Sequence, residues 1–315
     1  MPVNNRNIPY LIVVTGPTAI GKSAVSLEIA QHFNTEIISA DSRQLYREMK
    51  IGTAVPEPQE LQLVPHHFVH TRSIHEYYNA SRFESEVLNK LEELYLVHRV
   101  VVMAGGSMLY VDAVCNGIDD LPEVDPEIRR MLISEFEQNG IESLRIRLKM
   151  LDPAYYAEVD LKNHKRLLHA LEICLMTGKP YSGFRKNQVK KRPFRIIKTG
   201  LTASRDIIYD RINRRVDQMV LEGLEEEARS LYPFRDNNAL NTVGYREWFD
   251  AFDGKIPPGE VVEKIKSNTR RYARKQLTWF KRDQAVKWFD IGHKEEIIPW
   301  LEEQMQNEWN NTENW

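Results

Sequence analysis

The chain has 315 residues, and its 43 Lys and Arg nearly balance its 45 Asp and Glu, which leaves a formal net charge of −2 at pH 7. This balance excludes a protein that holds nucleic acid through bulk positive charge. Hydrophobic residues make up 42% of the sequence, enough to build the core of one large domain or two.

The cysteine content and the lack of long apolar runs predict a cytoplasmic protein. Cys115 and Cys174 lie far apart with no C-x-x-C spacing, so each is interpreted as a buried thiol in a reducing compartment. No apolar run approaches the roughly 18 residues of a membrane span, and we expect no membrane contact. Residues 1–7 are polar and do not resemble a signal peptide.

The first third of the chain alternates between strands and helices. Tyr10–Thr15 is a continuous apolar run typical of a buried strand, and an amphipathic helix is expected at Ser23–Phe33. The elements predicted next are a strand at Glu36–Ser39, a loop through Gly52, Pro56 and Pro58, a helix from Ser81 to His98 with a Ser81–Glu84 capping box, and a strand at Val100–Met103. This alternation predicts a parallel α/β sheet.

After about Val114 the pattern becomes helical, with Asp125-Pro126 and Asp152-Pro153 marking helix starts. The basic segment Arg185–Pro193 is predicted to be a flexible hinge, Phe194–Leu201 the last strand, and everything from Ser204 onward helical. The predicted domains are the first part of the α/β core at 1–114, a helical insertion at 115–193, the rest of the core at 194–235, and a helical C-terminal region at 236–315 that ends in an acidic tail.

A phosphate-binding motif follows the first strand. Residues 16–23 fit the pattern G-x-x-x-x-G-K-[ST] and are Gly16, Pro17, Thr18, Ala19, Ile20, Gly21, Lys22 and Ser23. In this motif backbone N–H groups surround a phosphate, Lys22 reaches its outer oxygens, and the Ser23 hydroxyl can hold Mg²⁺. Because a buried strand precedes the motif and a helix follows it, we favour a phosphate cradle over an incidental glycine-rich turn.

The cradle does not come with the usual nucleotide-hydrolysis residues. A GTPase carries [NT]-K-x-D, whereas the nearest match, Asn89-Lys90-Leu91-Glu92, lies inside a predicted helix. The strand at Val100–Met103 ends without the carboxylate that helps an ATPase hold Mg²⁺. Asp41 instead follows the second strand, at the edge where α/β sheets place ligands. It is a candidate general base, with a helix N-cap as an equally weighted alternative.

Eight separate blocks of this sequence resemble the tRNA dimethylallyltransferases, also called tRNA isopentenyltransferases, in the family's order over about residues 10–290. The blocks are Gly16–Ser23, Ser39–Arg47, Ile51–Ala54 with Pro56, Pro65–His67, Gly105–Tyr110, Thr177–Pro180, Val243–Glu247 and Arg271–Phe280. The resemblance implies a P-loop nucleotide-kinase-like sheet with a helical insertion. It also implies transfer of a dimethylallyl group from dimethylallyl diphosphate to N6 of adenosine 37, beside the tRNA anticodon, with Mg²⁺ as cofactor and a monomer as the expected form.

The resemblance also implies roles for individual residues. Asp41 would accept the proton of the adenine amine, and the other expected catalytic residues are Lys22, Ser107, Arg211 and Arg215. The two arginines lie one turn apart on a helix predicted at Asp206–Leu231, and a solvated helix face is their alternative. The residues expected to face the tRNA anticodon loop are Asp41, Ser42, Arg43, Gln44, Ser107, Arg129, Lys165, Arg166, Leu167, Leu168, His169, Thr242, Val243, Gly244, Tyr245, Arg246, Glu247, Lys275, Gln276, Trp279 and Arg282.

Four positions depart from the family's pattern. Ile20 replaces a small residue in the phosphate loop, Val55 replaces a frequent Lys, and Ser107 stands where Thr is common but keeps the hydroxyl. His169 stands where the family often has Arg, which puts that tRNA contact in question.

The segment Arg270–Arg282 supports RNA binding independently. As a helix it would gather six Lys and Arg within an arc of about 140°, with Tyr272, Ala273 and Phe280 on the opposite side. Such a face suits phosphate contacts, and a solvated helix paired with acidic neighbours is the alternative.

A metal site at the histidines and three other functions are the remaining alternatives that the sequence offers. His66, His67, His70 and His75 match no usual zinc spacing; 66–70 is predicted to be a strand, and we interpret them as core or edge histidines. Competing functions are an adenylate isopentenyltransferase that uses a free nucleotide, a kinase that uses the loop for ATP, and a non-catalytic RNA-binding protein.

Overall fold

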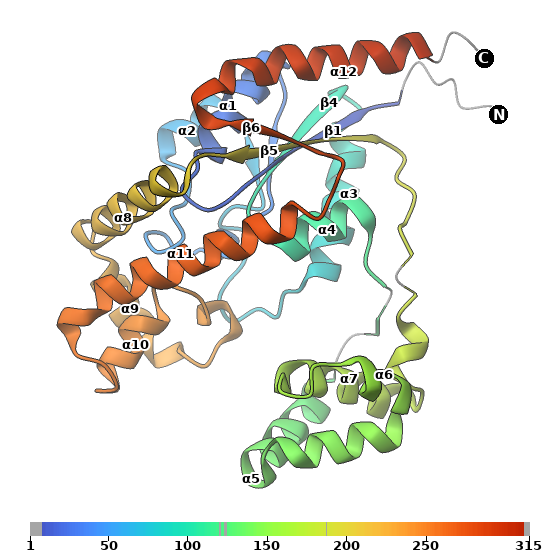
Figure 1. Ribbon diagram of the computed structural model, residues 1–315, viewed down its shortest axis with the longest axis vertical. Helices are drawn as coiled ribbons and strands as arrows, with labels where there is room; N and C mark the ends of the chain where they lie inside the picture. Colours follow the sequence, from blue (N-terminus) through green and yellow to red (C-terminus); the bar gives the residue numbers. More distant parts are fainter. Residues whose placement is uncertain (1–7, 120, 123–124, 187, 312–315) are drawn as a thin grey trace. The chain divides into compact units, whose positions relative to one another are not determined.

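The strands form one sheet of six parallel strands, in the order β3-β2-β4-β1-β5-β6, in the computed structural model (Figure 1). The structure describes residues 8–119, 121–122, 125–186 and 188–311, so the interpretations of residues 1–7 and of the end of the acidic tail, 312–315, lie outside it. The strands are β1 (Tyr10–Thr15), β2 (Ile37–Ser39), β3 (His66–His67), β4 (Val100–Ala104), β5 (Arg195–Thr202) and β6 (Val286–Asp290). The predicted parallel α/β sheet is confirmed.

Strand β1 lies in the middle of this sheet, and this position explains why its sequence is continuously apolar. All six of its residues are buried, and it pairs with β4 on one side and β5 on the other. A central parallel strand is covered on both faces, which selects a continuous run of β-branched and apolar side chains in place of an alternating one. The phosphate-binding motif begins directly after it.

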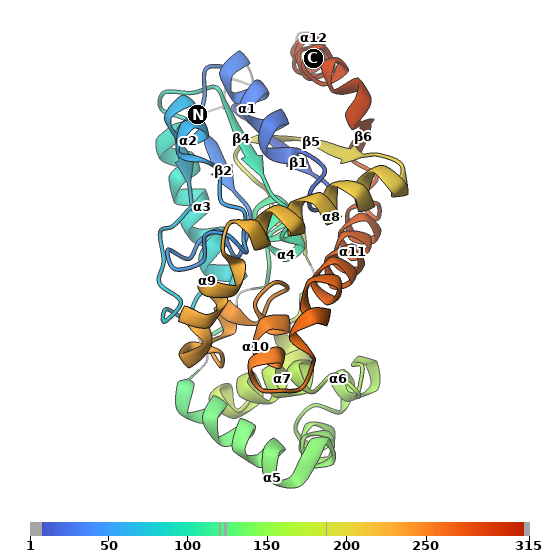
Figure 2. The ribbon, with the colours of Figure 1, turned by 90° about the vertical axis from the view of Figure 1, so that its left-hand side faces the viewer.

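Helices of the same compact unit pack around the sheet (Figure 2). Helix α1 packs against β1, β2 and β4, α12 packs against β5, and α8 packs against α11. The helices are α1 (Lys22–His32), α2 (Pro58–Leu63), α3 (Ala80–Leu94), α4 (Met108–Asn116), α8 (Arg205–Leu221), α9 (Leu224–Leu231), α10 (Arg246–Phe252), α11 (Val261–Phe280) and α12 (Ile297–Asn311). Short 3₁₀ turns occupy Tyr232–Phe234, Asn238–Leu240, Pro258–Glu260 and Ile291–Glu296.

Three predicted helix boundaries or loops are wrong. Helix α3 begins at Ala80, near the predicted Ser81, but it ends at Leu94, before the predicted His98. Its N-cap is Asn79, whose side chain accepts from the Arg82 N–H, so the predicted Ser81–Glu84 capping box is wrong. The helix predicted at Asp206–Leu231 is two helices, α8 and α9, separated at Gly223, whose φ of 98° is left-handed. The loop predicted around Pro58 contains helix α2.

The prediction of helices alone after Ser204 is also wrong. Residues Val286–Asp290 form β6, which pairs with β5 at the edge of the sheet. The strand predicted at His66–His70 is shorter, because Phe68 and His70 have positive φ angles of 64° and 52°. No cluster of three metal-ligating side chains occurs among the described residues, and His67 instead contacts the Glu36 carboxylate at 2.5 Å.

Residues Asn116–Lys190 form a second compact unit, close to the insertion predicted at 115–193. It consists of α5 (Pro126–Leu151), α6 (Pro153–Glu158), α7 (His164–Thr177) and a 3₁₀ turn at Tyr181–Phe184. Asp125 and Asp152 cap α5 and α6, each with Pro in the first turn, which confirms the two predicted starts. The described residues of 236–315, predicted as a separate region, belong to the unit that holds the sheet.

The segment predicted to be a flexible hinge is anchored at Arg192. The Arg192 guanidinium donates hydrogen bonds to the carbonyl oxygens of Ala113 and Val114 and to the Glu84 carboxylate. Both charged side chains are 7% exposed. The flexible-hinge prediction is therefore wrong at this residue.

None of the described helices is long and apolar enough to cross a membrane.

Candidate functional site

The phosphate-binding motif forms the turn between β1 and α1. The Lys22 ammonium points back over this turn and donates to the carbonyl oxygens of Gly16 at 3.1 Å and Pro17 at 2.8 Å. Ile20, the departure from the small residue usual in the family, is fully buried and joins the core. The Lys22 ammonium therefore lies against the backbone of the loop, and the buried Ile20 side chain attaches the loop to the hydrophobic core.

Strands β2 and β4 end beside the same loop. Asp41 follows β2, and its Oδ1 accepts from the backbone N–H of Arg43 at 2.9 Å and of Gln44 at 3.4 Å. Asp41 therefore does stabilise the turn that follows it, as the cap interpretation proposed. Both bonds end on Oδ1, and Asp41 also lines the cavity, where a carboxylate can act as a base.

Gly105, Gly106 and Ser107 follow β4 and hold this turn from the other side. A Cβ atom on Gly105 would lie 2.2 Å from the Ala40 carbonyl oxygen, so only glycine permits the two strand ends to approach this closely. The Ser107 Oγ accepts from the Ser42 N–H at 2.8 Å and donates to the Ser42 Oγ at 3.0 Å. Ser107, predicted to be catalytic, positions the residue next to Asp41.

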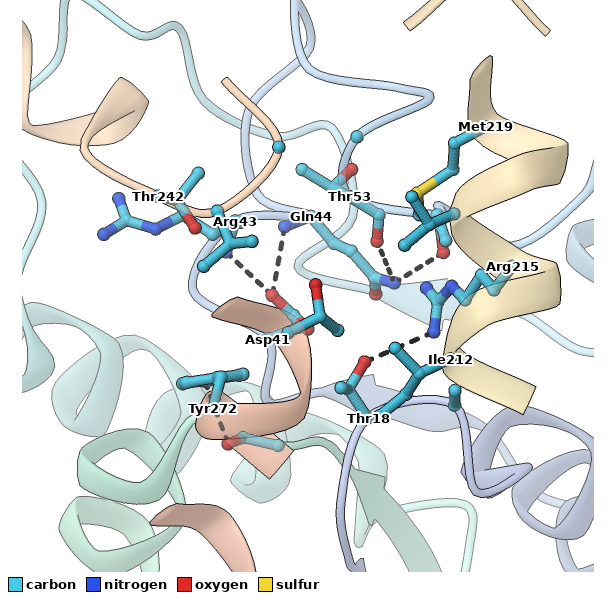
Figure 3. A pocket seen from close by; sticks show the side chains of 18 of the residues that line it. Thr18, Asp41, Arg43, Gln44, Thr53, Ile212, Arg215, Met219, Thr242 and Tyr272 are labelled. Atoms are coloured by element: carbon cyan, nitrogen blue, oxygen red, sulfur yellow. Dashed lines mark hydrogen bonds between the residues drawn. The ribbon is translucent and has the colours of Figure 1, made fainter. Parts of the chain in front are cut away.

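Helix α8 brings two arginines to the phosphate loop. Arg211 donates to the Ile20 carbonyl oxygen at 2.7 Å, and Arg215 donates to the Thr18 hydroxyl at 3.4 Å. Both line the cavity; Arg215 is partly buried, which argues against a solvated helix face for this residue, whereas Arg211 is exposed. In Figure 3, Asp41 lies between Arg215 and Tyr272 of α11.

These elements line a cavity of about 710 Å³, where Lys22, Arg211 and Arg215 gather at the phosphate loop and Asp41 supplies a carboxylate; Arg43, Arg214 and Arg246 also line it. Burial lowers the pKa of Lys22 to about 8, with a further decrease from Arg215 and an opposing increase from Asp41. Burial also lowers the pKa of Arg215, again opposed by Asp41. Buried cations that repel each other favour an anionic ligand with several charges, such as a diphosphate.

One wall of the cavity is apolar. Ile212, Val216 and Met219 recur on one face of α8, next to the face that carries the two arginines. Figure 3 shows Ile212, Arg215 and Met219 in order along the helix, with Met219 at the end remote from Thr18. A charged wall beside an apolar wall suits a ligand with an anionic head and a hydrocarbon tail.

Helix α11 confirms the predicted division into a packed face and a charged face only in part. Arg271, Arg274 and Lys275 on the helix are exposed, as are Lys281 and Arg282 just beyond it. Arg270, however, is partly buried and donates to Asn213 at 2.7 Å. Trp279, predicted to face tRNA, donates its indole N–H to Asp112 at 2.8 Å.

Gln276 on the same helix braces the phosphate loop. Its Oε1 accepts from the Thr18 N–H at 2.8 Å, and its Nε2 donates to the Gly106 carbonyl oxygen at 2.8 Å. It is 2% exposed and lines the cavity, so its side chain supports the loop, and its contact with tRNA stays a prediction.

Other side chains predicted to face tRNA are partly or fully buried and make contacts within the protein, because a motif position does not give the direction of its side chain. Arg43 donates to the carbonyl oxygens of Asn238 and Ala239, and Gln44 donates to those of Thr53 and Ala54. Four more of these side chains, all less than 10% exposed, are Leu167, Leu168, Tyr245 and Glu247. Ser42, Arg43, Gln44, Thr242, Val243, Gly244 and Arg246 line the cavity.

The second unit places its predicted tRNA residues around one buried carboxylate. Glu172 of α7 is 1% exposed and lies 3.4 Å from Arg129 and 3.6 Å from His169. Lys165 and Arg166 are exposed in the first turn of the same helix. His169 therefore contacts a carboxylate within its own unit.

Sequence reasoning missed Glu227 of α9 and the role of Tyr272. The Tyr272 hydroxyl donates to the Gly106 carbonyl oxygen at 3.4 Å, and burial raises its pKa to about 12, with a further increase from Asp41. Glu227 holds the loop at residues 50–54. Neither residue matches a pattern that indicates such a contact.

Comparisons with known proteins identify the family of this chain. A family model described as IPP transferase matches residues 44–283. The chain is 56% identical over 292 residues to tRNA dimethylallyltransferase 1 of Bacteroides fragilis, which covers 93% of this chain and 97% of that protein. It is 52% identical over 289 residues to the tRNA dimethylallyltransferase of Christiangramia forsetii, with 92% and 96% covered.

Solved structures of proteins in this family are also similar to this chain. The tRNA isopentenylpyrophosphate transferase of Bacillus halodurans is 35% identical with a TM-score of 0.70, and the match covers 97% of this chain and 99% of that one. A eukaryotic dimethylallyltransferase acting on tRNA is 25% identical with a TM-score of 0.73, over 90% of this chain and 74% of that one.

Proposed function

Since the chain belongs to the IPP transferase family, we propose that it transfers a dimethylallyl group from dimethylallyl diphosphate to N6 of adenosine 37 of tRNA, next to the anticodon. The observation that carries this proposal is the single cavity that joins the phosphate loop, two arginines, an apolar wall and Asp41. A kinase needs the first of these features but has no use for an apolar wall beside the cations. The names of the relatives favour tRNA over a free nucleotide as acceptor.

The diphosphate would occupy the cationic side of the cavity. Backbone N–H groups at the start of α1 would bind its oxygens, and Lys22, Arg211 and Arg215 would stabilise the charge that develops as it leaves. Because these groups are already held by hydrogen bonds within the protein, little reorganisation is needed during the reaction.

Asp41 would accept the proton that the reaction releases. The adenine N6 forms a bond to C1 of the dimethylallyl group while the bond from C1 to the diphosphate oxygen breaks, and one N6 proton passes to the Asp41 carboxylate. General base catalysis of this kind contributes about 10²–10⁴ in rate. The turn bonds to Oδ1 would orient the carboxylate.

The residues at the loop fit a magnesium ion. Ser23 lies in the first turn of α1 and lines the cavity, and no group of three protein ligands occurs among the described residues. Mg²⁺ commonly takes few protein ligands and completes its shell with substrate phosphate oxygens and water. Ser23 would hold the ion, which when bound would neutralise charge on the diphosphate.

The apolar wall of α8 would hold the five-carbon tail. Met219 lies four residues beyond Arg215, about 6 Å further along the helix axis, which is close to the reach of a five-carbon chain. Met219 would therefore limit the length of the donor's tail.

The tRNA would approach through the exposed cations. Five of these lie on or just after α11, and the exposed ends of Lys165, Arg166 and Arg129 lie on the second unit. We place the reaction in the reducing cytoplasm, where the buried free thiols Cys115 and Cys174 would persist. A monomer suffices, because one chain supplies every group named above.

A label-transfer assay tests the function. Labelled dimethylallyl diphosphate is supplied with unmodified tRNA, with the same tRNA carrying guanosine at position 37, with AMP, or with no acceptor. We expect label only on the first tRNA. Label on AMP but not on tRNA would contradict the proposal and favour the adenylate enzyme, whereas label on the guanosine variant would contradict the assigned position.

A further inference from the structure

The carboxylate of Glu227 accepts hydrogen bonds from four groups of the protein. Its Oε2 accepts from the backbone N–H of Lys50 and of Ile51, both at 2.9 Å, and its Oε1 accepts from the N–H of Gly52 at 3.0 Å. The fourth donor is the Tyr245 hydroxyl, 2.6 Å from Oε1. Three consecutive amides directed at one carboxylate fix the path of that backbone segment.

The loop that Glu227 holds forms part of the cavity wall. Gly52, Thr53 and Ala54 line the cavity together with Asp41. A Cβ atom on Gly52 would lie 2.6 Å from the Tyr245 ring, so the loop packs directly on that ring. The buried Tyr245 thus contacts both Glu227 and the loop.

The loop in turn holds the residue that orients Asp41. The Gln44 amide donates to the carbonyl oxygens of Thr53 at 3.3 Å and Ala54 at 2.9 Å, while the Gln44 Oε1 accepts from Ser39 at 3.1 Å. The backbone N–H of Gln44 donates to Asp41 Oδ1. Hydrogen bonds, joined by the backbone of residues 50–54 and by Gln44 itself, therefore connect α9 to the carboxylate in the cavity.

We propose that Glu227 is a positioning residue, which sets the orientation of Asp41 through the loop at residues 50–54 and Gln44. The inference rests on the proposed function, in which Asp41 accepts the adenine proton. Glu227 is not among the residues that line the cavity, so it would contact neither substrate, and its expected effect is on the rate of transfer. Misplacement of a reacting group by about 1 Å can cost about 100-fold in rate.

Glu227→Gln tests the proposal in the full chain. The amide cannot accept from both pairs of donors, so the loop loses at least part of its attachment with almost no change in side-chain volume. We expect kcat for transfer to tRNA to fall by about 10–100-fold, with KM for donor and tRNA within about threefold of wild type. Tyr245→Phe removes one of the four hydrogen bonds and should lower kcat less.

Glu226→Gln is the matched control, since Glu226 is exposed on the same helical turn and the charge change is identical. Measurements are made well below the melting temperature of every variant. A wild-type kcat in folded Glu227→Gln, or a rise in KM alone, would overturn the inference. If Glu227→Gln does not fold, Tyr245→Phe decides in the same way. If wild type and Glu226→Gln also fail to transfer the label, the proposed function has failed instead.

Discussion

Raising the pH should weaken binding of the donor through a single group, Lys22. Burial and Arg215 hold the pKa of Lys22 at about 8 in the free protein, far below its usual value. A bound diphosphate would favour the charged form and raise this pKa, so the affinity falls as Lys22 deprotonates in the free protein. Lys22 is about 90% protonated at about pH 7 and about 10% protonated at about pH 9. The dissociation constant should therefore rise about tenfold, or about 1.4 kcal/mol, over this interval.

The measurement is equilibrium binding of dimethylallyl diphosphate without tRNA, at constant magnesium and ionic strength. Lys22→Arg is the control, because a guanidinium stays charged over this range and should give weaker but pH-independent binding. A wild-type dissociation constant that stays flat between about pH 7 and about pH 9 would refute the reasoning. So would an equal slope in Lys22→Arg, which would assign the effect to another group.

Three further predictions concern the base, the tail pocket and the buried pair of Arg192 and Glu84. Asp41→Asn keeps an oxygen that accepts the hydrogen bonds of the turn, but the amide cannot act as a base. The single-turnover rate should therefore fall by about 10²–10⁴, while the donor binds at least as tightly. An unchanged rate would show that Asp41 is not the base. Met219→Ala should raise kcat/KM for geranyl diphosphate relative to the five-carbon donor by roughly tenfold, and equal use of both donors by wild type would contradict the pocket limit. Arg192→Met should lower the free energy of unfolding in urea by about 3–5 kcal/mol, because it removes the guanidinium that contacts the buried Glu84 carboxylate. Partial recovery in Arg192→Met with Glu84→Gln would support this cause, and an unchanged midpoint would contradict it.

The parts of the fold that the sequence predicted well are those with contiguous signals. Tyr10–Thr15 and the motif after it need no information from elsewhere in the chain, since a buried strand and a glycine-rich turn are visible in eight or so neighbouring residues. The missed strand β6 is a short edge strand in which only Val286 and Phe289 are buried, and it directly follows a strongly helical segment. The hydrogen bonds to β5 stabilise this strand, although its own sequence has no clear strand pattern.

The site was predicted in its chemistry but not in its supporting contacts. Lys22, Asp41 and Arg215 meet in one cavity because the segments after β1 and β2 and the middle of α8 line the same space. Gln276 and Tyr245 belong to recognisable motifs, yet they face inward and support the loops of the cavity. A linear pattern specifies which residues occur together, whereas their direction depends on the helix against which each one packs.

The sheet order also determines when the site can form during synthesis. Strand β1 needs β5 as a neighbour, and Thr15 bonds to Thr199, which is 184 residues later. At about 5–20 residues per second the ribosome needs roughly 10–40 s to supply that partner. The hydrogen bond from the Thr18 N–H to Gln276 can form only later, because Gln276 lies 258 residues further along the chain. The phosphate loop is thus among the first segments to be synthesised, and it is completed only when most of the chain has left the ribosome.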